Sequence, residues 1–352
     1  MTQTFQYSHL FQLESGVTLP GYHLAYTTYG TLNEKKDNVV WIFHALTANS
    51  NAAEWWPGLV GEGRFFDPAK YFIICVNKPG SPYGSISPLS NNPQTNQPYY
   101  HDFPVFTIRD IINTYKNLRD HLGITQVHVG LGGSTGGMQL LEWAIDEPDF
   151  FEHIVPIVTN AVLSPWGIAF NASQRLAIEA DSTWLEKRAD AGQKGLAAAR
   201  SIALISYRQY KGYEVTQPRE KAFVPLANNV VFAADNYQRY QGLKLINRFN
   251  VISYYRLTQT MDSHDVGRNR NGVVEALKKI KAQTLIIGIK TDLLYPLTEQ
   301  EFLKEHIPHS QLFIIASDFG HDGFLLEYEK IEVALKNFIT HKQKNFLKIV
   351  NQ

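Results

Sequence analysis

The chain has 352 residues, of which 44% are apolar, 12% aromatic and 19% charged, with 33 basic and 33 acidic side chains. This composition predicts a globular protein rather than a disordered one, because so many aromatic and branched side chains can offset the entropy lost on folding. A formal net charge of zero argues against nucleic acid as a partner. No apolar run approaches the roughly 20 residues that a membrane span requires, so we expect no membrane partner.

The chain contains a single cysteine, Cys75, which cannot form an intrachain disulfide. This suits a reducing compartment, and the N-terminal residues do not resemble a secretory signal, so we predict a cytoplasmic protein. Cys75 lies inside a strand-like run and is expected to be a buried core residue rather than a reactive one.

Alternation of polar and apolar residues over residues 1–37 predicts antiparallel edge strands, and strand and helix patterns alternate from there on. This alternation predicts an α/β fold with a mostly parallel sheet and right-handed crossovers. The predicted buried strands are 39–43, 71–76, 127–131, 154–158, 284–289 and 311–316, and the predicted helices are 107–122, 138–145, 298–306 and 325–340.

Two stretches interrupt this alternation. Residues 78–103 are dense in Pro, Gly, Asn and Ser and form a loop long enough to predict a functional role. Residues 164–280 look helical without clear strands, which predicts an inserted helical cap between two parts of one core, 1–163 and 281–352. Such a cap would place a cleft at the carboxyl ends of the strands.

The pattern Gly-x-Ser-x-Gly occurs at Gly132-Gly-Ser-Thr-Gly136, after a predicted strand and before a predicted helix. In that context it is typical of a nucleophile elbow, in which small neighbours let strand and helix approach around a strained serine. The helix N-terminus then points amide groups toward developing negative charge. The alternative is a phosphate-binding or purely structural glycine turn. We interpret Ser134 as the candidate nucleophile.

A serine nucleophile needs a base and a carboxylate that orients the base, in the chain order Ser, Asp or Glu, His for this architecture. Asp292 directly follows the predicted strand 284–289, and His321 follows the next one, 311–316. Both therefore lie at the same edge of the sheet as Ser134. These three residues are the predicted catalytic triad.

Other acid and histidine positions are weaker candidates for the triad. A residue adjacent to the base normally points the wrong way to orient its ring, and the remaining pairs fall in the cap and in the long loop. These rivals are Asp322, next to His321, and the pairs His264-Asp265 and His101-Asp102.

Two backbone amides are needed to stabilise the oxyanion of an acyl-transfer intermediate. The amide of Thr135, next to the nucleophile, is the first candidate. The second should come from the loop after strand 39–43, which reads His44-Ala-Leu-Thr47, and by position it is the amide of Leu46. His44 is expected to brace this loop rather than to act in catalysis.

In these motifs the chain resembles the homoserine O-acyltransferases of the α/β-hydrolase superfamily, typified by homoserine O-acetyltransferase. The likeness covers nearly the whole chain. It rests on His44-Ala-Leu-Thr47, Trp55-Trp56, Tyr83-Gly-Ser85, Asp102-Phe-Pro104, Thr107-Ile-Arg-Asp110, Gly132-Gly-Ser-Thr-Gly-Gly-Met-Gln139, Glu142-Trp143, Tyr240-Gln-Gly242, Arg248-Phe249, Ser253-Tyr254, Met261-Asp262, Asp292-Leu-Leu294 and Gly320-His-Asp322.

The resemblance implies an α/β-hydrolase fold and a ping-pong acyl transfer in methionine biosynthesis. Ser134 would take the acetyl group of acetyl-CoA, with His321 as base and Asp292 orienting it, and homoserine would then accept it. Acetyl-CoA is thus a co-substrate, and no bound cofactor or metal is implied. Family members are commonly dimers, so a homodimer through the cap is expected.

The resemblance also implies how the amino acid is held. A cap arginine should bind its carboxylate, a task suited to the bidentate guanidinium fork. We carry this role to Arg208, with Arg200 as the second choice, and we expect Asp322 to bind the ammonium group. Thr135 stands where the family usually has Met, which bears on the acyl pocket.

Several alternatives remain open at the level of the sequence. The same triad with water admitted would make an esterase, and a binding protein on this fold is a further possibility. The acyl group could be succinyl rather than acetyl, and serine could replace homoserine as acceptor. The long cap and the 78–103 loop favour exclusion of water and hence the transferase.

Overall fold

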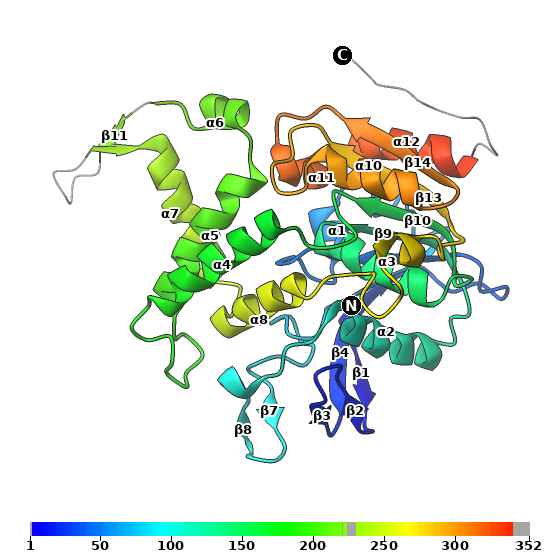
Figure 1. The fold of residues 1–352 in the computed structure, drawn as a ribbon, viewed down its shortest axis with the longest axis horizontal. Coiled ribbons are helices and arrows are strands. Elements are labelled where there is room, and N and C mark those ends of the chain that lie inside the picture. The colour runs from blue at the N-terminus through cyan, green and yellow to red at the C-terminus, as the bar shows by residue number, and fades with distance from the viewer. Residues whose placement is uncertain (1, 220, 224–229, 341–352) are drawn as a thin grey trace.

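The computed structural model describes residues 2–219, 221–223 and 230–340, which form a sheet flanked by helices and a cap on one side of it (Figure 1). The sheet has eight strands in the order β1-β4-β6-β5-β9-β10-β13-β14. Their bounds are β1 Thr2–Tyr7, β4 Tyr22–Tyr29, β5 Val39–Phe43, β6 Phe72–Val76, β9 Val127–Gly133, β10 Phe151–Ile157, β13 Gln283–Ile289 and β14 Ser310–Ile315.

The sheet is parallel from β6 through β14, and the first two strands of the order, β1 and β4, pair antiparallel. Both the antiparallel edge and the six parallel strands agree with the predictions from the sequence. The fold is therefore the α/β-hydrolase fold. Helices cover both faces of a parallel sheet, so that all side chains of a central strand are buried. Such strands therefore appear in the sequence as short, continuous apolar runs.

Two apolar clusters cover the two faces of the sheet. Along β5, Trp41 belongs to the cluster that includes α2 and α3 side chains, whereas the neighbouring Ile42 belongs to the cluster that includes α12. Neighbouring residues fall into different clusters because successive side chains of a strand point to opposite faces of the sheet. The core helices are α1 Ala52–Trp55, α2 Ile108–Leu122, α3 Thr135–Asp146, α9 Val273–Leu277, α10 Leu297–His306, α11 Gly323–Leu326 and α12 Tyr328–Thr340.

The cap lies between β10 and β13 in the chain and packs as a group of helices over one end of the sheet (Figure 1). It also holds a short antiparallel pair, so the expectation of a cap without strands is wrong. The bounds of its elements are α4 Pro165–Glu179, α5 Gln193–Tyr207, α6 Tyr210–Thr216, β11 Lys221–Phe223, β12 Val230–Phe232, α7 Ala233–Ile246 and α8 Val251–Asp262.

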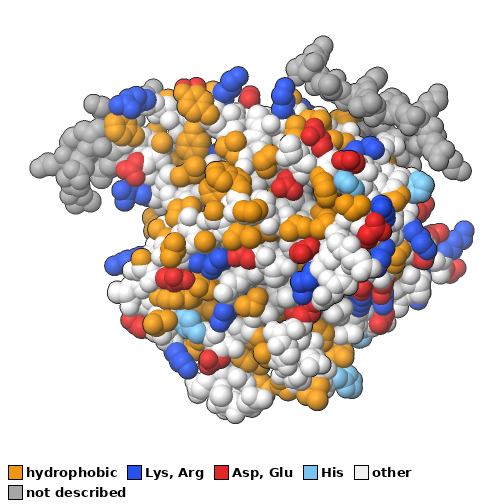
Figure 2. All heavy atoms as spheres, in the orientation of Figure 1, with side chains coloured by type: hydrophobic (Ala, Val, Ile, Leu, Met, Phe, Trp, Pro, Cys, Tyr) orange, Lys and Arg blue, Asp and Glu red, His pale blue; other side chains and the backbone are white. Residues whose placement is uncertain are grey.

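Apolar side chains gather over the cap in the view of Figure 2. Large apolar side chains that are exposed on the cap helices include Trp166, Leu176, Ile205, Val215 and Leu243. Within the described residues, no helix combines the length and the apolar character needed to cross a bilayer.

The long loop after β6 is ordered by small elements of its own. It contains the hairpin of β7 Asn91–Asn92 with β8 Gln97–Pro98 and the 3-10 turn η1 Tyr100–Asp102. A second small pair near the N-terminus joins β2 Phe11–Gln12 to β3 Thr18–Leu19, and another 3-10 turn, η2 Gly320–Asp322, precedes α11. The second part of the core is expected to span residues 281–352. Its last residues, 341–352, lie outside the described part of the chain.

Strand β9, helix α3 and strand β5 approach one another very closely at the predicted elbow. A Cβ atom added to Gly136 would lie 2.1 Å from the carbonyl oxygen of Phe43, and one added to Gly132 would lie 2.5 Å from the Gly136 carbonyl carbon. Both contacts are with backbone, which cannot rotate away. These two glycines are therefore needed for the backbone to turn as it does.

We expect Gly136→Ala to lower the free energy of unfolding by about 1–3 kcal/mol, because the methyl group must push β5 away from α3. Urea unfolding followed by tryptophan fluorescence measures this loss. Glu34→Ala, in an exposed loop, is the matched control and should leave the midpoint unchanged. Equal midpoints for Gly136→Ala and the parent chain would contradict the close approach.

Candidate active site

Ser134 occupies the turn between β9 and α3 with φ 57° and ψ −123°, a left-handed φ that a serine rarely adopts. Its amide donates to the carbonyl oxygen of Ile157 at 2.9 Å, which ties the turn to the end of β10. The side chain is almost fully buried. The strained backbone thus projects the hydroxyl beyond the carboxyl end of the sheet.

Asp292 and His321 form a buried pair. Oδ2 of Asp292 lies 2.7 Å from Nδ1 of His321, and Oδ1 accepts from the amides of Leu294 at 2.8 Å and Tyr295 at 3.0 Å. The carboxylate is therefore fixed from both oxygens. A carboxylate on Nδ1 holds the imidazole in the tautomer whose Nε2 is free to accept a proton.

Aromatic rings enclose the imidazole of His321. The ring centroids of Tyr295, Phe324 and Tyr207 lie 5.3, 5.5 and 5.6 Å from that of His321. Burial is the largest single influence and lowers the pKa of His321, but the charge and hydrogen bond of Asp292, together with the charge of Asp322, outweigh it, so that the net pKa lies above its ordinary value of 6.5. The site therefore holds a stronger base than a free histidine.

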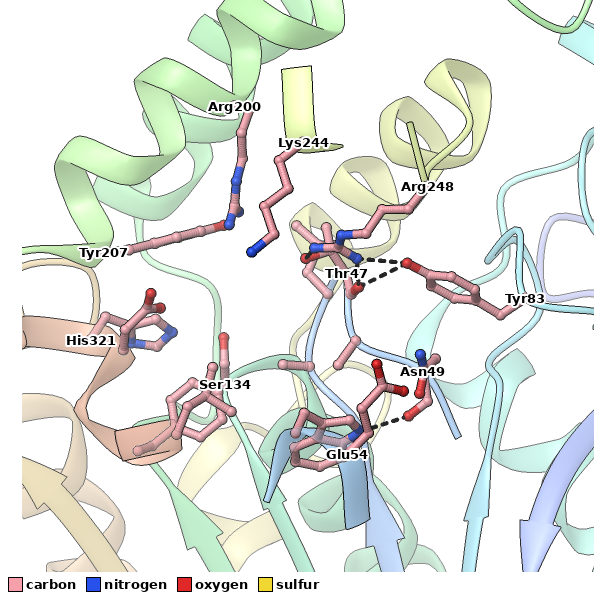
Figure 3. Close-up of a pocket in the computed structure, with 17 residues that line it drawn as sticks. Thr47, Asn49, Glu54, Tyr83, Ser134, Arg200, Tyr207, Lys244, Arg248 and His321 are labelled. Carbon is pink, nitrogen blue, oxygen red and sulfur yellow. Dashed lines mark hydrogen bonds between the residues drawn. The ribbon is translucent and has the colours of Figure 1, made fainter. Parts of the chain in front are cut away.

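Ser134 and His321 face the same cavity, of about 540 Å³, between the strand ends and the cap (Figure 3). Its volume lies in the range of small-molecule sites. The lining residues come from the loop after β5, from α5 and α7 in the cap, and from η2 and α11. They include Ala45, Leu46, Thr47, Tyr83, Arg200, Tyr207, Lys244, Arg248, Asp322 and Phe324.

The two candidate oxyanion amides belong to elements that meet at Ser134. Thr135 is the first residue of α3, and Leu46 lines the cavity in the loop after β5. Within the described part of the chain, the Leu46 amide donates to no backbone carbonyl. An unpaired amide beside a nucleophile is what an oxyanion acceptor requires.

Of the two predicted substrate-binding residues, one lines the cavity and the other does not. Asp322 lines the cavity, but Arg208 does not; instead Arg208 forms an ion pair with Asp322 and donates to the Tyr237 hydroxyl at 2.9 Å. Arg208 is the C-cap of α5 and has extended backbone, so its side chain leaves the helix face. Arg200, the second choice, does line the cavity.

Sequence reasoning assigned no role to the other polar groups that face the cavity. Tyr207 follows Arg200 by two helical turns and its ring centroid lies 5.5 Å from the Arg200 guanidinium. Lys244 points from α7 toward the cavity, and Arg248 donates to the Thr47 carbonyl at 2.6 Å (Figure 3). Arg200 and Tyr207 are two helical turns apart and therefore lie on the same face of α5. This spacing is the one sequence feature from which their contact could have been predicted.

The rival pairs lie elsewhere. Neither His264-Asp265 nor His101-Asp102 is among the residues that line the cavity at Ser134. Nε2 of His264 lies 2.9 Å from the Asn160 carbonyl oxygen, and the ring of His101 packs edge-on against Trp184 at 4.5 Å. Both histidines therefore have structural contacts.

One group of potential metal ligands occurs among the described residues. His128, Glu152 and His153 place one ligand atom each within 4.8 Å of one another. They lie near the beginnings of β9 and β10, at the opposite end of these strands from Ser134. Nδ1 of His128 is 2.7 Å from the Glu152 carboxylate, so a hydrogen bond already accounts for the proximity of these two side chains.

Comparisons with known proteins agree with this geometry. Residues 38–328 match the alpha/beta hydrolase fold family. The chain is 47% identical over 339 residues to a homoserine O-acetyltransferase from Cyclobacterium marinum, covering 96% of this chain and 95% of the relative, and 40% identical to one from Salinibacter ruber, covering 94% and 95%.

Among solved structures, the crystal structure of homoserine O-acetyltransferase from Bacillus anthracis superposes with a TM-score of 0.88 at 26% identity, over 98% of this chain and 99% of that one. The likeness therefore extends through both core and cap. Together with the nearly full-length relatives, it shows that this chain is an enzyme of the homoserine O-acetyltransferase family, a family of acyltransferases with the α/β-hydrolase fold.

Proposed function

We propose that the enzyme transfers an acetyl group from acetyl-CoA to the hydroxyl of L-homoserine through an acyl-Ser134 intermediate. The observation that carries this proposal is one cavity that holds Ser134, the Asp292-paired His321, and oppositely charged groups on its rim. Neither a bound cofactor nor a metal takes part in the proposed chemistry. Acetyl-CoA serves as a co-substrate only.

In the first half-reaction, Oγ of Ser134 attacks the thioester carbonyl while Nε2 of His321 takes its proton. The Leu46 and Thr135 amides stabilise the oxyanion that forms. Asp292 stabilises the imidazolium, and its two backbone donors hold its carboxylate in place. Collapse of the intermediate expels the coenzyme A thiolate, which receives the proton from His321.

In the second half-reaction, the homoserine hydroxyl takes the place of the thiol. His321 removes its proton, the alkoxide attacks the acyl carbonyl, and the same amides hold the oxyanion until Ser134 leaves and is reprotonated by His321. Burial of the base among Tyr207, Tyr295 and Phe324 limits the access of water, which favours transfer over hydrolysis.

Charge on the rim of the cavity supports an amino acid as the acceptor. Arg200 faces the cavity and can offer a bidentate fork to a carboxylate. Asp322, one residue from the base and braced by Arg208, can take the ammonium group. We therefore assign the carboxylate to Arg200 rather than to Arg208, whose guanidinium is already paired.

The basic residues Lys244 and Arg248 on the rim suit a donor that carries phosphates, as coenzyme A does (Figure 3). The exposed apolar side chains of the cap support self-association, and we propose a second copy of this chain as their partner. The buried Cys75 thiol suits the cytoplasmic location that we propose.

Mixing the enzyme briefly with acetyl-CoA should add the mass of one acetyl group to the intact protein, because the acyl-enzyme is slow to hydrolyse. Homoserine should discharge this adduct and accelerate coenzyme A release strongly. Parallel reactions with succinyl-CoA and with serine identify the donor and acceptor. Ser134→Ala should form no adduct while remaining folded by circular dichroism. Equal release of coenzyme A with and without acceptor would indicate a hydrolase instead.

Arg200→Lys should raise KM for homoserine by about 10- to 100-fold, the loss expected for a hydrogen-bonded charged pair, and should leave acetylation of Ser134 unchanged. Steady-state kinetics at saturating acetyl-CoA measure this. Arg239→Lys, on an exposed arginine of the same cap, is the control and should have no effect. If Arg208→Lys raises KM and Arg200→Lys does not, the carboxylate role belongs to Arg208.

The rate should rise with pH along a limb whose apparent pKa lies above 6.5, since the base must be neutral and Asp292 raises its pKa. Asp292→Asn removes this charge, whereas the burial that lowers the pKa of His321 remains, so the limb should move to lower pH. The maximal rate should fall by about 10²- to 10⁴-fold. Asp318→Asn, an exposed acid nearby, should keep the profile of the parent chain. A limb that stays in place in Asp292→Asn would remove Asp292 from the triad.

A further inference from the structure

A buried lysine lies behind the oxyanion loop. Lys78 follows the end of β6 and is only 2% exposed. Its Nζ donates to the carbonyl oxygens of His44 at 3.1 Å and Ala45 at 3.0 Å, and to the Thr135 hydroxyl at 3.2 Å. The three contacts match the three hydrogens of an ammonium group. The side chain therefore links the ends of three elements, β6, β5 and α3.

The contact with Ala45 acts directly on a catalytic amide. The Ala45 carbonyl and the Leu46 N–H belong to one planar trans peptide group, in which the two bonds point in opposite directions. Holding the oxygen on the Lys78 side therefore turns the Leu46 N–H toward the opposite side. A cation on the carbonyl also polarises the peptide and strengthens its N–H as a donor.

His44 reinforces the same peptide group. Its Nε2 accepts from the Lys78 amide at 3.2 Å, which leaves the proton on Nδ1, and Nδ1 donates to the Ala45 carbonyl at 2.8 Å. Burial and the neighbouring Lys78 charge keep the pKa of His44 well below its ordinary value, so the ring is neutral. The Ala45 carbonyl thus accepts from two buried donors.

We infer that Lys78 is a positioning residue that locks the oxyanion hole of this enzyme and places a buried positive charge behind it. It donates to the Thr135 hydroxyl and to the Ala45 carbonyl, whose peptide group contains the Leu46 amide. The inference rests on the acyl-Ser134 mechanism proposed above. It adds a group that neither the triad nor the substrate-binding residues include.

Among the described residues, Lys78 forms no ion pair with a carboxylate, and its Nζ contacts only neutral oxygen atoms. Burial lowers its pKa to about 7, and the interaction with Cys75 on β6 opposes this lowering. The titratable groups that face it are Cys75, whose own pKa burial raises, and the neutral His44 from the loop after β5. Neither changes charge between about pH 6 and 9. The developing oxyanion is therefore the negative charge that Lys78 meets during the reaction.

The test uses p-nitrophenyl acetate, so that it does not depend on the natural donor. Lys78→Met should slow acetylation of Ser134 by about 10²- to 10³-fold, as loss of one oxyanion donor does, with KM for the ester unchanged. Affinity for a boronic acid that forms a tetrahedral adduct with Ser134 should fall by a similar factor. A fall confined to KM, or an unchanged rate, would overturn the inference.

A second pair of variants keeps the test decisive if Lys78→Met does not fold. Thr135→Val leaves Lys78 in place but removes one of its three acceptors, and should slow acetylation by about 3- to 10-fold. Thr135→Ser restores the hydroxyl that accepts from Lys78 and should therefore be acetylated faster than Thr135→Val. Equal rates for Thr135→Val and Thr135→Ser would exclude a role for the Lys78 contact.

The pH profile gives a readout that a merely structural role would not move. Acetylation in the parent chain should decline above about pH 7, as Lys78 loses its proton, and this decline should be absent in Lys78→Met. An identical decline in both chains would contradict the inference. Absence of any acetylation of the parent chain would instead refute the acyl-Ser134 mechanism itself, so the two failures are distinguishable.

Discussion

The meeting of three backbones at Ser134 is the constraint on which the rest of the site depends. A serine held at φ 57° is stable only where the surrounding packing enforces it. Here β9 and α3 press together at Gly132 and Gly136, and the end of β5 lies against Gly136. The same contact that strains Ser134, the proposed nucleophile, therefore brings the loop after β5, with the proposed oxyanion amide of Leu46, beside it.

Apart from Thr135 at the start of α3, the other proposed catalytic groups and the positioning residue Lys78 reach this point on loops that leave the carboxyl ends of parallel strands. Lys78 follows β6, Leu46 follows β5, Asp292 follows β13 and His321 follows β14. Side chains far apart in the sequence converge because parallel strands all end at one edge of the sheet. The sheet supplies rigidity, and the cap closes the cavity with Arg200 and its neighbours. In the proposed mechanism the core supplies the triad and Asp322, and the cap adds Arg200 for the carboxylate of the substrate.

Sequence patterns anticipated the parts of this arrangement that depend on local periodicity. The buried strands and the elbow follow from apolar runs and glycine spacing, and their order placed Asp292 and His321 at one edge. The direction of a side chain at the end of a helix cannot be predicted from such periodicity. Arg208 caps α5 and turns away, whereas Arg200 lies on a helix face, a distinction set by backbone angles that no residue pattern encodes. Lys78 escaped notice because a lysine in a loop is ordinarily solvated.

The buried lysine explains how a chain with no net charge can still present a positive field to a reacting carbonyl. A carboxylate partner would neutralise Lys78 in the resting enzyme and would also repel the oxyanion. Carbonyl and hydroxyl oxygens satisfy its hydrogen bonds without neutralising its charge. Burying that charge destabilises the folded resting enzyme, and the negative charge of the oxyanion offsets part of this destabilisation when it forms. Stabilisation that appears only as the oxyanion develops lowers the barrier rather than strengthening substrate binding.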